Sequence, residues 1–156
     1  MTTKAVKSQG AQLWFINNAG TPALEAIGQV TQATGLGGTT NNIDITNFDS
    51  VAKEYLVGLQ DPGTLSFDIV FDPTNTSHQD LITVAQAGTR NQFILLLSDG
   101  VAAPTLTGGN IVPPVGRTSA YFLASVHQLQ ADVQKENVAM LKVQLKLSGT
   151  ITWTYA

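Results

Sequence analysis

Residues 35–63 read GLGGTTNNIDITNFDSVAKEYLVGLQDPG and connect two segments with strand character. Glycines open this stretch, Asp61-Pro62-Gly63 closes it, and the Asn and Asp residues between them favour turns. A compact domain seldom contains so long a connection, and such segments are usually functional or disordered. Apolar residues are scattered through it, among them Ile43, Ile45, Phe48, Val51, Tyr55, Leu56 and Leu59. We therefore predict a long protruding loop whose apolar side chains need a binding partner.

Directly after this stretch, residues 64–71 alternate strictly between apolar and mainly polar side chains. Leu65, Phe67, Ile69 and Phe71 share one face, whereas Thr64, Ser66, Asp68 and Val70 share the other. This period of two predicts a half-buried strand that ends at Asp72-Pro73. Residues 140–148 alternate in the same way, with Lys142, Gln144 and Lys146 on the outward face.

The remaining pattern predicts further strands and one helix. Strands are expected at residues 12–17, 24–34 (the weaker one), 121–130 and 151–155. The apolar run within residues 90–97 is typical of a strand that is buried on both faces. Residues 1–10 read as a flexible N-terminal arm, and the Pro- and Gly-rich residues 101–118 as a second loop.

Residues 77–87 carry an apolar stripe with helical spacing, with Ser77 as the expected N-cap and Gly88 as the expected stop. One helix beside seven or eight strands predicts a mainly β protein. We expect residues 1–156 to form a single domain: a β-sandwich or barrel of two antiparallel sheets, with one flanking α-helix and a long protruding loop.

Composition narrows the class of protein. Hydrophobic residues make up 43% of the 156 residues and charged residues only 12%, about half the usual share. This surface suits either a protein covered by copies or partners, or an ordinary β-protein. The net charge of −3 argues against a nucleic-acid binder with a basic face. No cysteine is present, and the N-terminal apolar run is too short for a signal peptide, so we expect a soluble protein made in a cytoplasm.

No pattern of catalytic or metal-binding residues is convincing. His78 and His127 lack ligand spacing, and we interpret both as surface or partly packed side chains. Asp68 and Asp72 would lie about 13 Å apart on one strand, too far for a glycosidase pair.

The acidic residues of the long loop do not match a calcium site either. Counting from Asp44, the sixth and twelfth positions hold Asp49 and Tyr55, where a calcium loop needs Gly and Glu. Residues 35–38 lack the Lys-Ser/Thr that follows the glycines of a phosphate loop, so they read as a hinge. We therefore expect no enzyme activity, no cofactor and no metal.

The order and spacing of these elements resemble those of the major tail tube proteins of long-tailed, non-contractile bacteriophages. The stretches that carry the resemblance are DITNFDS at 44–50, YLVGLQDPG at 55–63, the strand 64–71, and FLASV at 122–126 followed by residues 137–147. The resemblance covers nearly the whole chain. Residues 101–118 are longer than expected and read as an extra external loop, and no C-terminal immunoglobulin-like domain, which some members have, is expected after Tyr155.

The resemblance implies a structural virion protein that polymerises as stacked hexameric rings and forms the conduit for DNA ejection. Joining six sheets into one inner barrel would remove the unpaired edges of an isolated sandwich. The apolar residues of the long loop would then be inter-ring or inter-subunit contacts, and Ser66 and Asp68 are the candidate lumen-facing residues. Six copies would carry six times −3, or −18, which suits a conduit that repels DNA. Lys142 and Lys146 are expected on another polar face.

The implied partners are further copies of the chain, a tape measure protein, tail tip or baseplate proteins and a tail terminator protein. DNA would pass through the lumen without tight or sequence-specific binding, and no membrane is involved. The protein would be assembled in the host bacterial cytoplasm and reside in the virion tail. Two alternatives remain: a non-enzymatic β-sandwich module that attaches to carbohydrate or a cell surface, and a tube protein like that of type VI secretion.

Overall fold

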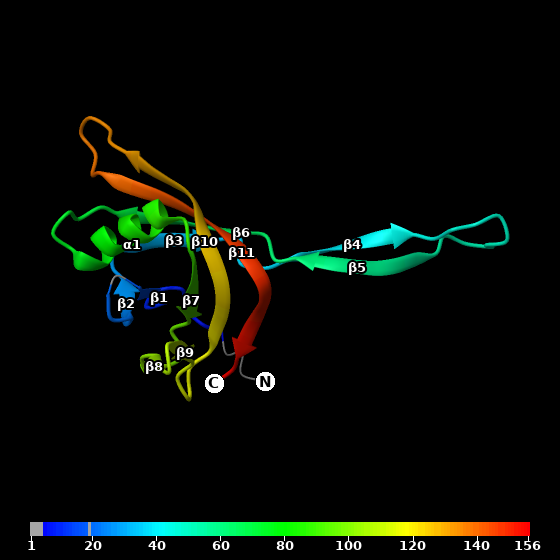
Figure 1. Ribbon diagram of the computed structural model, residues 1–156, viewed down its shortest axis with the longest axis horizontal. Helices are drawn as coiled ribbons and strands as arrows, with labels where there is room; N and C mark the ends of the chain where they lie inside the picture. Colours follow the sequence, from blue (N-terminus) through cyan, green and yellow to red (C-terminus); the bar gives the residue numbers. More distant parts are fainter. Residues whose placement is uncertain (1–4, 19) are drawn as a thin grey trace.

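The computed structural model describes residues 5–18 and 20–156, and its core is one seven-stranded antiparallel sheet that curls on itself (Figure 1). The strand order is β2-β1-β7-β10-β11-β6-β3. The strands are β1 (Gln12–Asn17), β2 (Ala23–Ile27), β3 (Val30–Thr34), β6 (Thr64–Val70), β7 (Arg90–Leu96), β10 (Ser119–Asp132) and β11 (Met140–Thr154). The predicted mainly β fold with one flanking helix is confirmed.

The sequence suggested two packed sheets, but the two layers of the fold belong to one continuous sheet. They are continuous because β10 and β11 are long enough to run through both layers. These two strands contain 14 and 15 residues and pair along their length. Their register shifts between Tyr121 and Leu123 and between Val126 and Gln128. Such bulges bend a strand and increase its twist, which lets the sheet turn a corner. The strands expected separately at 140–148 and 151–155 are therefore a single strand.

Inward-facing side chains of alternate strand positions fill the curled sheet. Phe15, Phe67, Phe93 and Phe122 are each at most 1% exposed and come from four different strands. The Phe93 ring stacks between those of Phe15 and Phe122, with centroids 6.1 and 5.9 Å away. Leu65, Phe67 and Ile69 of β6 point into this core, as the alternation predicted.

The segment expected as one weak strand over residues 24–34 is two strands, β2 and β3, at opposite edges of the sheet. Gly28 and Gln29 form the turn between them, and Gln29 adopts a left-handed φ of 58°. The sequence pattern did not mark this break, because neither Asn-Gly nor Asp-Gly is present there.

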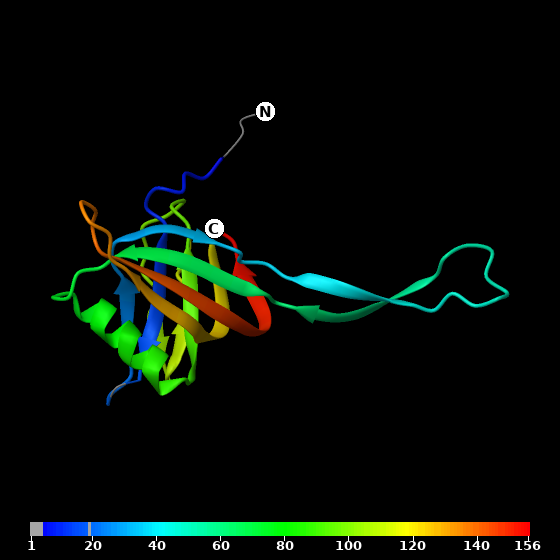
Figure 2. The same ribbon diagram turned by 90° about the horizontal axis from the view of Figure 1, so that it is seen from above.

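Helix α1 (Thr76–Ala87) covers one side of the core with Leu81 and Val84 (Figure 2). Its N-cap is Asn75, not Ser77: the Asn75 Oδ1 accepts hydrogen bonds from the Ser77 N–H at 3.0 Å and the Ser77 hydroxyl at 2.8 Å. Asn is an equally good capping residue, and it starts the helix two residues earlier than expected. Gly88 ends the helix with a left-handed φ of 66°, as expected.

His78 corrects the interpretation of a surface or partly packed histidine, since its side chain is fully buried. Its Nδ1 accepts the Asp72 backbone N–H at 3.1 Å, and its Nε2 lies 2.8 Å from the Gly28 carbonyl oxygen. Two backbone groups of the chain therefore satisfy both ring nitrogens, which offsets the cost of burying a polar ring. His127 is exposed on β10.

Residues 101–118 are more ordered than the predicted loop. They contain a short hairpin of β8 (Thr105–Thr107) and β9 (Asn110–Val112), which lies over the outer face of the sheet. Ile111 is buried there with Ile16, Ile94 and Leu96. Because Phe93 lies in the main core and Ile94 beneath this hairpin, β7 is buried on both faces, as its apolar run indicated.

Hydrogen bonds from Arg117 connect the N-terminal residues to the segment 101–118, which contains the β8–β9 hairpin. Its guanidinium is only 3% exposed and donates to Leu97 O, Ala102 O, Gly10 O and Gln12 Oε1, at 2.6 to 3.2 Å. The Ser98 hydroxyl also donates to the Lys7 carbonyl oxygen. Of the predicted flexible arm at 1–10, residues 1–4 lie outside the described part; residues 7–10 are anchored by these bonds.

Candidate functional site: assembly surfaces

A two-stranded hairpin, β4 (Thr39–Asp44) and β5 (Tyr55–Asp61), projects far from the curled sheet (Figures 1 and 2). We call residues 35–63 the hairpin arm. The sequence predicted a loop here, but the strands pair from Thr39 opposite Asp61 to Asp44 opposite Tyr55. The β-branched and aromatic residues of these segments favour strands, whereas the turn-forming residues gather in the tip between them.

The tip of the hairpin arm is held by bonds between side chains and the backbone. The Asp44 carboxylate accepts the Thr46 N–H at 2.9 Å, and the Asn47 side chain accepts the Asp49 N–H at 2.9 Å. The bonds from Thr46 hold the pKa of Asp44 below its usual value. The Asp44 carboxylate and the Asn47 amide therefore stabilise the turn, and no group of three or more potential metal ligands occurs in the described residues.

All seven apolar residues predicted as contacts lie on the hairpin arm, and all are exposed. Phe48, Val51 and Leu59 are the most exposed, with relative accessibilities of 109, 104 and 92%. Val57, which the sequence reading left out, is also exposed; its place in the alternation of β5 could have revealed it. An isolated two-stranded hairpin is marginally stable in water, and an exposed apolar patch of this kind is typical of an interaction surface.

The root of the hairpin arm is rigidly defined. Gly35 has a left-handed φ of 93°, and a side chain at this position would collide with the Thr64 carbonyl oxygen. At the other strand, the Asp61 carboxylate accepts the Gly63 N–H at 2.9 Å. The glycine is thus required for the close approach of the backbone to β6, where the sequence reading proposed a flexible hinge.

A polar sheet face lies on the outside of β3, β6, β11 and the second half of β10. Ser66 and Asp68 of β6 are half-buried on this face, opposite the core. Asp68 pairs in register with Gln32 of β3 on one side and Lys142 of β11 on the other. Side chains of registered neighbours point to the same face.

This register corrects the expectation that Lys142 and Lys146 lie on another polar face. Lys142 is directly opposite Asp68, and Lys146 is opposite Thr64. Each lysine has an acidic partner: Lys142 Nζ lies 3.3 Å from Asp132 Oδ2, and Lys146 Nζ lies 3.3 Å from Asp61 Oδ1. Strand alternation alone did not reveal this, because it does not say which strands are neighbours.

Both edges of this four-stranded layer lack a partner strand in the described part of the chain. β3 pairs only with β6. β10 pairs with β7 through residues 119–125, so its residues 126–132 pair with β11 alone. Because the strands of the layer alternate in direction, β3 and β10 run antiparallel to each other.

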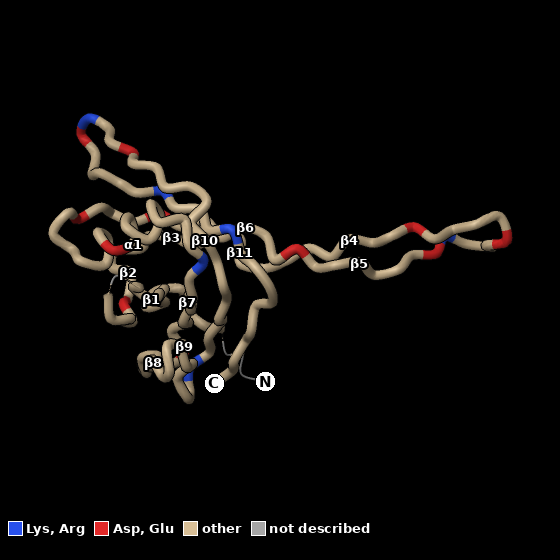
Figure 3. The backbone as a smooth tube through the Cα atoms, viewed as in Figure 1, with Lys and Arg blue, Asp and Glu red and all other residues tan. Residues whose placement is uncertain are grey.

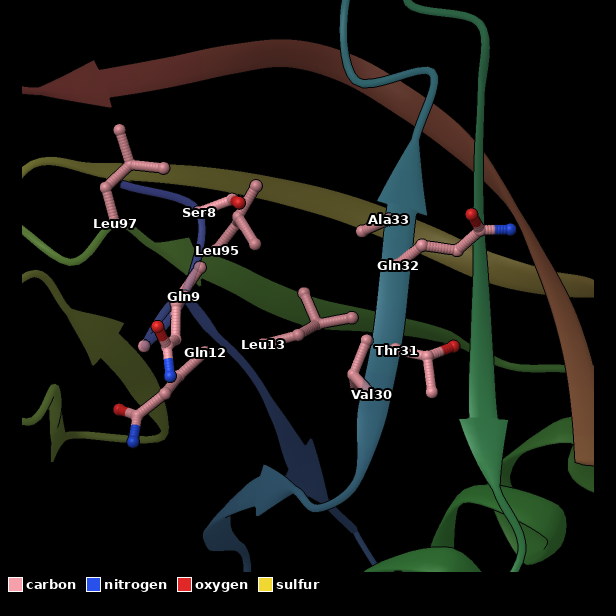
Figure 4. A pocket seen from close by; sticks show the side chains of 12 residues that line it. Ser8, Gln9, Gln12, Leu13, Val30, Thr31, Gln32, Ala33, Leu95 and Leu97 are labelled. Carbon is pink, nitrogen blue, oxygen red and sulfur yellow. The ribbon is translucent and has the colours of Figure 1, made fainter. Parts of the chain in front are cut away.

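A hollow of about 470 Å³ marks the place where the sheet fails to close (Figure 4). Figure 4 shows Leu13, Leu95 and Val30 around it, with β3 on one side and residues 8–12 on the other. No ionisable side chain lines this hollow. It leaves the free edge of β3 accessible.

Charged residues are sparse, and Figure 3 shows mainly acidic residues along the hairpin arm and both acidic and basic residues at the end of the β10–β11 hairpin. No helix in the described residues is long and apolar enough to span a membrane.

A curled sheet with free layer edges and a projecting apolar hairpin defines the class of fold to which this protein belongs. Known structures share this fold: the SPP1 tail tube (TM-score 0.69, 9% identity, 97% of this chain and 80% of that one) and the tail of an empty gene transfer agent particle (TM-score 0.65, 14% identity, 92% and 95%). The tube terminator of the PVC extracellular contractile injection system is also similar (TM-score 0.69, 11% identity, 99% of both chains).

The chain belongs to the lambda-like phage tail tube family, whose model matches residues 4–156. Structural protein 3 of Pseudomonas phage PAJU2 is 33% identical over 100 residues, which span 64% of this chain and 60% of that protein. The predicted family is confirmed, and the chain is a structural protein of the phage tail tube.

Proposed function

We propose that this protein polymerises as stacked hexameric rings and thereby forms the conduit through which phage DNA leaves the particle. The observation that carries the proposal is the pair of free edges on the polar four-stranded layer. Unpaired edges invite pairing with another chain, and a closed ring of copies removes them. Since β3 and residues 126–132 run antiparallel, joining them between copies continues the alternating order of the sheet.

In this arrangement the polar sheet face lines the lumen, and Ser66 and Asp68 face the DNA. Its side chains are mostly uncharged amides and hydroxyls, with each lysine next to a carboxylate. Affinity for DNA comes mainly from cationic contacts to phosphates, so such a wall suits transport without tight binding.

The hairpin arm supplies the contact between rings or neighbouring subunits. Ile43, Ile45, Phe48, Val51, Tyr55, Leu56 and Leu59 become buried against other copies. Ordering the arm against a partner also compensates for the marginal stability of a free hairpin.

The proposed partners are further copies of the chain, a tape measure protein, tail tip or baseplate proteins and a tail terminator. The protein has no enzymatic role, and assembly takes place in the host bacterial cytoplasm before the tube becomes part of the virion.

Negative-stain electron microscopy of the concentrated protein tests the proposal. We expect rings or tubes with sixfold symmetry. A protein that stays monomeric at high concentration, even with a tail tip or tape measure scaffold added, would overturn it. Glycan binding without polymerisation would favour a carbohydrate-attachment module instead.

A further inference from the structure

The polar sheet face contains two cations that would hold DNA if they were free. Lys142 and Lys146 lie four residues apart on β11, about 13 Å along the strand. Both lysine side chains are about half exposed, with relative accessibilities of 52 and 50%. An exposed lysine on the wall of a conduit would increase the affinity of the wall for DNA, because it neutralises phosphates and releases their counterions.

Each of these lysines has a carboxylate partner that comes from another strand. Asp132, at the end of β10, reaches Lys142, and Asp61, at the root of the hairpin arm, reaches Lys146, both at 3.3 Å. Asp61 is further fixed by the Gly63 N–H, and this bond and Lys146 hold the pKa of Asp61 below its usual value. The partner of Lys146 therefore stays ionised at neutral pH.

Asp68 provides the contrast on the same face. Although it is opposite Lys142 in register, its Oδ2 accepts a hydrogen bond from Gln32 Nε2 at 2.8 Å. It forms no ion pair with either lysine. The acids on this face are thus divided between two that pair with lysines and one that pairs with an amide.

We propose that Asp61 and Asp132 neutralise Lys146 and Lys142, so that the wall of the tube does not retain DNA. This inference rests on the proposed function, in which the polar sheet face lines the lumen. Such exposed ion pairs contribute little to the stability of the fold. Their role is instead to cancel the charge of each lysine where the phosphate backbone of DNA passes.

Co-sedimentation of a short fluorescent DNA duplex with assembled tubes, across a range of salt concentrations, tests the inference. We expect wild-type tubes to release the duplex and tubes of Asp132→Asn or Asp61→Asn to retain it. The log–log slope of binding against salt should steepen by about 0.9 for each phosphate contact that a freed lysine gains. Asp132→Asn is the primary variant, because it lies away from the hairpin arm.

Asp68→Asn is the matched control: it removes the same charge from the same face without freeing a lysine, and should release DNA like the wild type. Asp132→Asn combined with Lys142→Gln should also restore release. Equal retention by Asp132→Asn and Asp68→Asn, or no retention by Asp132→Asn, would overturn the inference while tubes still form. Wild-type protein that forms no tubes would overturn the proposed function, and this inference with it.

Discussion

His78 holds two parts of the chain together at the start of α1. Its ring accepts the Asp72 N–H and contacts the Gly28 carbonyl oxygen, and its side chain is fully buried. The Gly28–Gln29 turn joins the two edge strands of the sheet, so this imidazole links that turn to the helix.

Replacing His78 with Ala should lower the free energy of unfolding by about 2–3 kcal/mol, because it leaves two backbone groups without partners and removes buried packing. Urea denaturation followed by circular dichroism measures this. The control is His127→Ala, at an exposed position on β10, which should change stability by less than about 0.5 kcal/mol. Equal effects of the two substitutions would contradict the structural role of His78.

Glu25 is the residue whose charge opposes folding. Its Oε2 is buried and finds no donor in the described part of the chain, while Oε1 accepts from Asn17. Burial, and secondly the Asp80 carboxyl on α1, raise the pKa of Glu25 above its ordinary value of 4.5. A group with a raised folded-state pKa stabilises the fold below its ordinary pKa, and this stability is lost as pH rises through the raised value.

Glu25→Gln should therefore be more stable than the wild type at pH 7, and the advantage should shrink toward pH 4. A neutral amide avoids the cost of the buried carboxylate at pH 7, while at low pH it replaces a carboxyl that is already protonated. Urea unfolding at both pH values measures the difference. A variant with the same relative stability at pH 4 and pH 7 would contradict this account.

At the scale of elements, we expect the stability of the curled sheet not to depend on the hairpin arm. The arm leaves the sheet after β3, at Gly35, and returns to it at β6, after Gly63, and its seven predicted contact residues are exposed. The sheet keeps its own core of phenylalanines and leucines, to which the arm contributes no fully buried side chain. Loss of the arm should therefore spare the fold and affect assembly.

Replacing residues 41–60 with a short Gly/Ser linker should leave a folded β domain but abolish ring stacking. Circular dichroism and thermal unfolding check the fold, and electron microscopy checks assembly. As a milder control, Phe48→Ser with Leu59→Ser keeps the hairpin while removing two of its most exposed apolar side chains, and should weaken stacking. Tubes that form without the arm would show that the arm is not the contact between rings.

At the scale of the whole molecule, the free edges of β3 and β10 are the places where we propose that copies join. The chain contains no cysteine, so engineered pairs report contacts between copies without background. Thr31→Cys, combined in turn with His127→Cys, Gln130→Cys or Ala131→Cys, scans the possible registers of an antiparallel joint. All four positions are exposed in the single copy.

We expect at least one pair to give a disulfide-linked ladder of up to six copies under oxidising conditions, on non-reducing gels. Each single-cysteine variant should give no band larger than a dimer. Tubes that form without any ladder would mean that other edges join the ring. Gels and electron microscopy together therefore test separately where copies join and whether a tube forms.

Local sequence determined much of this protein. Period-two alternation predicted β6 and the first half of β11, and a left-handed C-cap at Gly88 marked the end of α1. The clustering of apolar residues among turn formers predicted an interaction element at the hairpin arm, where these side chains are exposed, and the order of the elements identified the family. These signals are short-range, because strand alternation, capping and turn chemistry act between residues close in the chain.

Contacts between distant segments were decided only by the tertiary structure. The pairing of β11 with β6 placed Lys142 beside Asp68, and the pairing of β11 with β10 brought Asp132 to Lys142 as its partner. The burial of His78 depended on the Gly28 carbonyl, 50 residues away. Register, strand order and the partners of buried polar groups depend on long-range packing, which the spacing of residues along the chain does not encode.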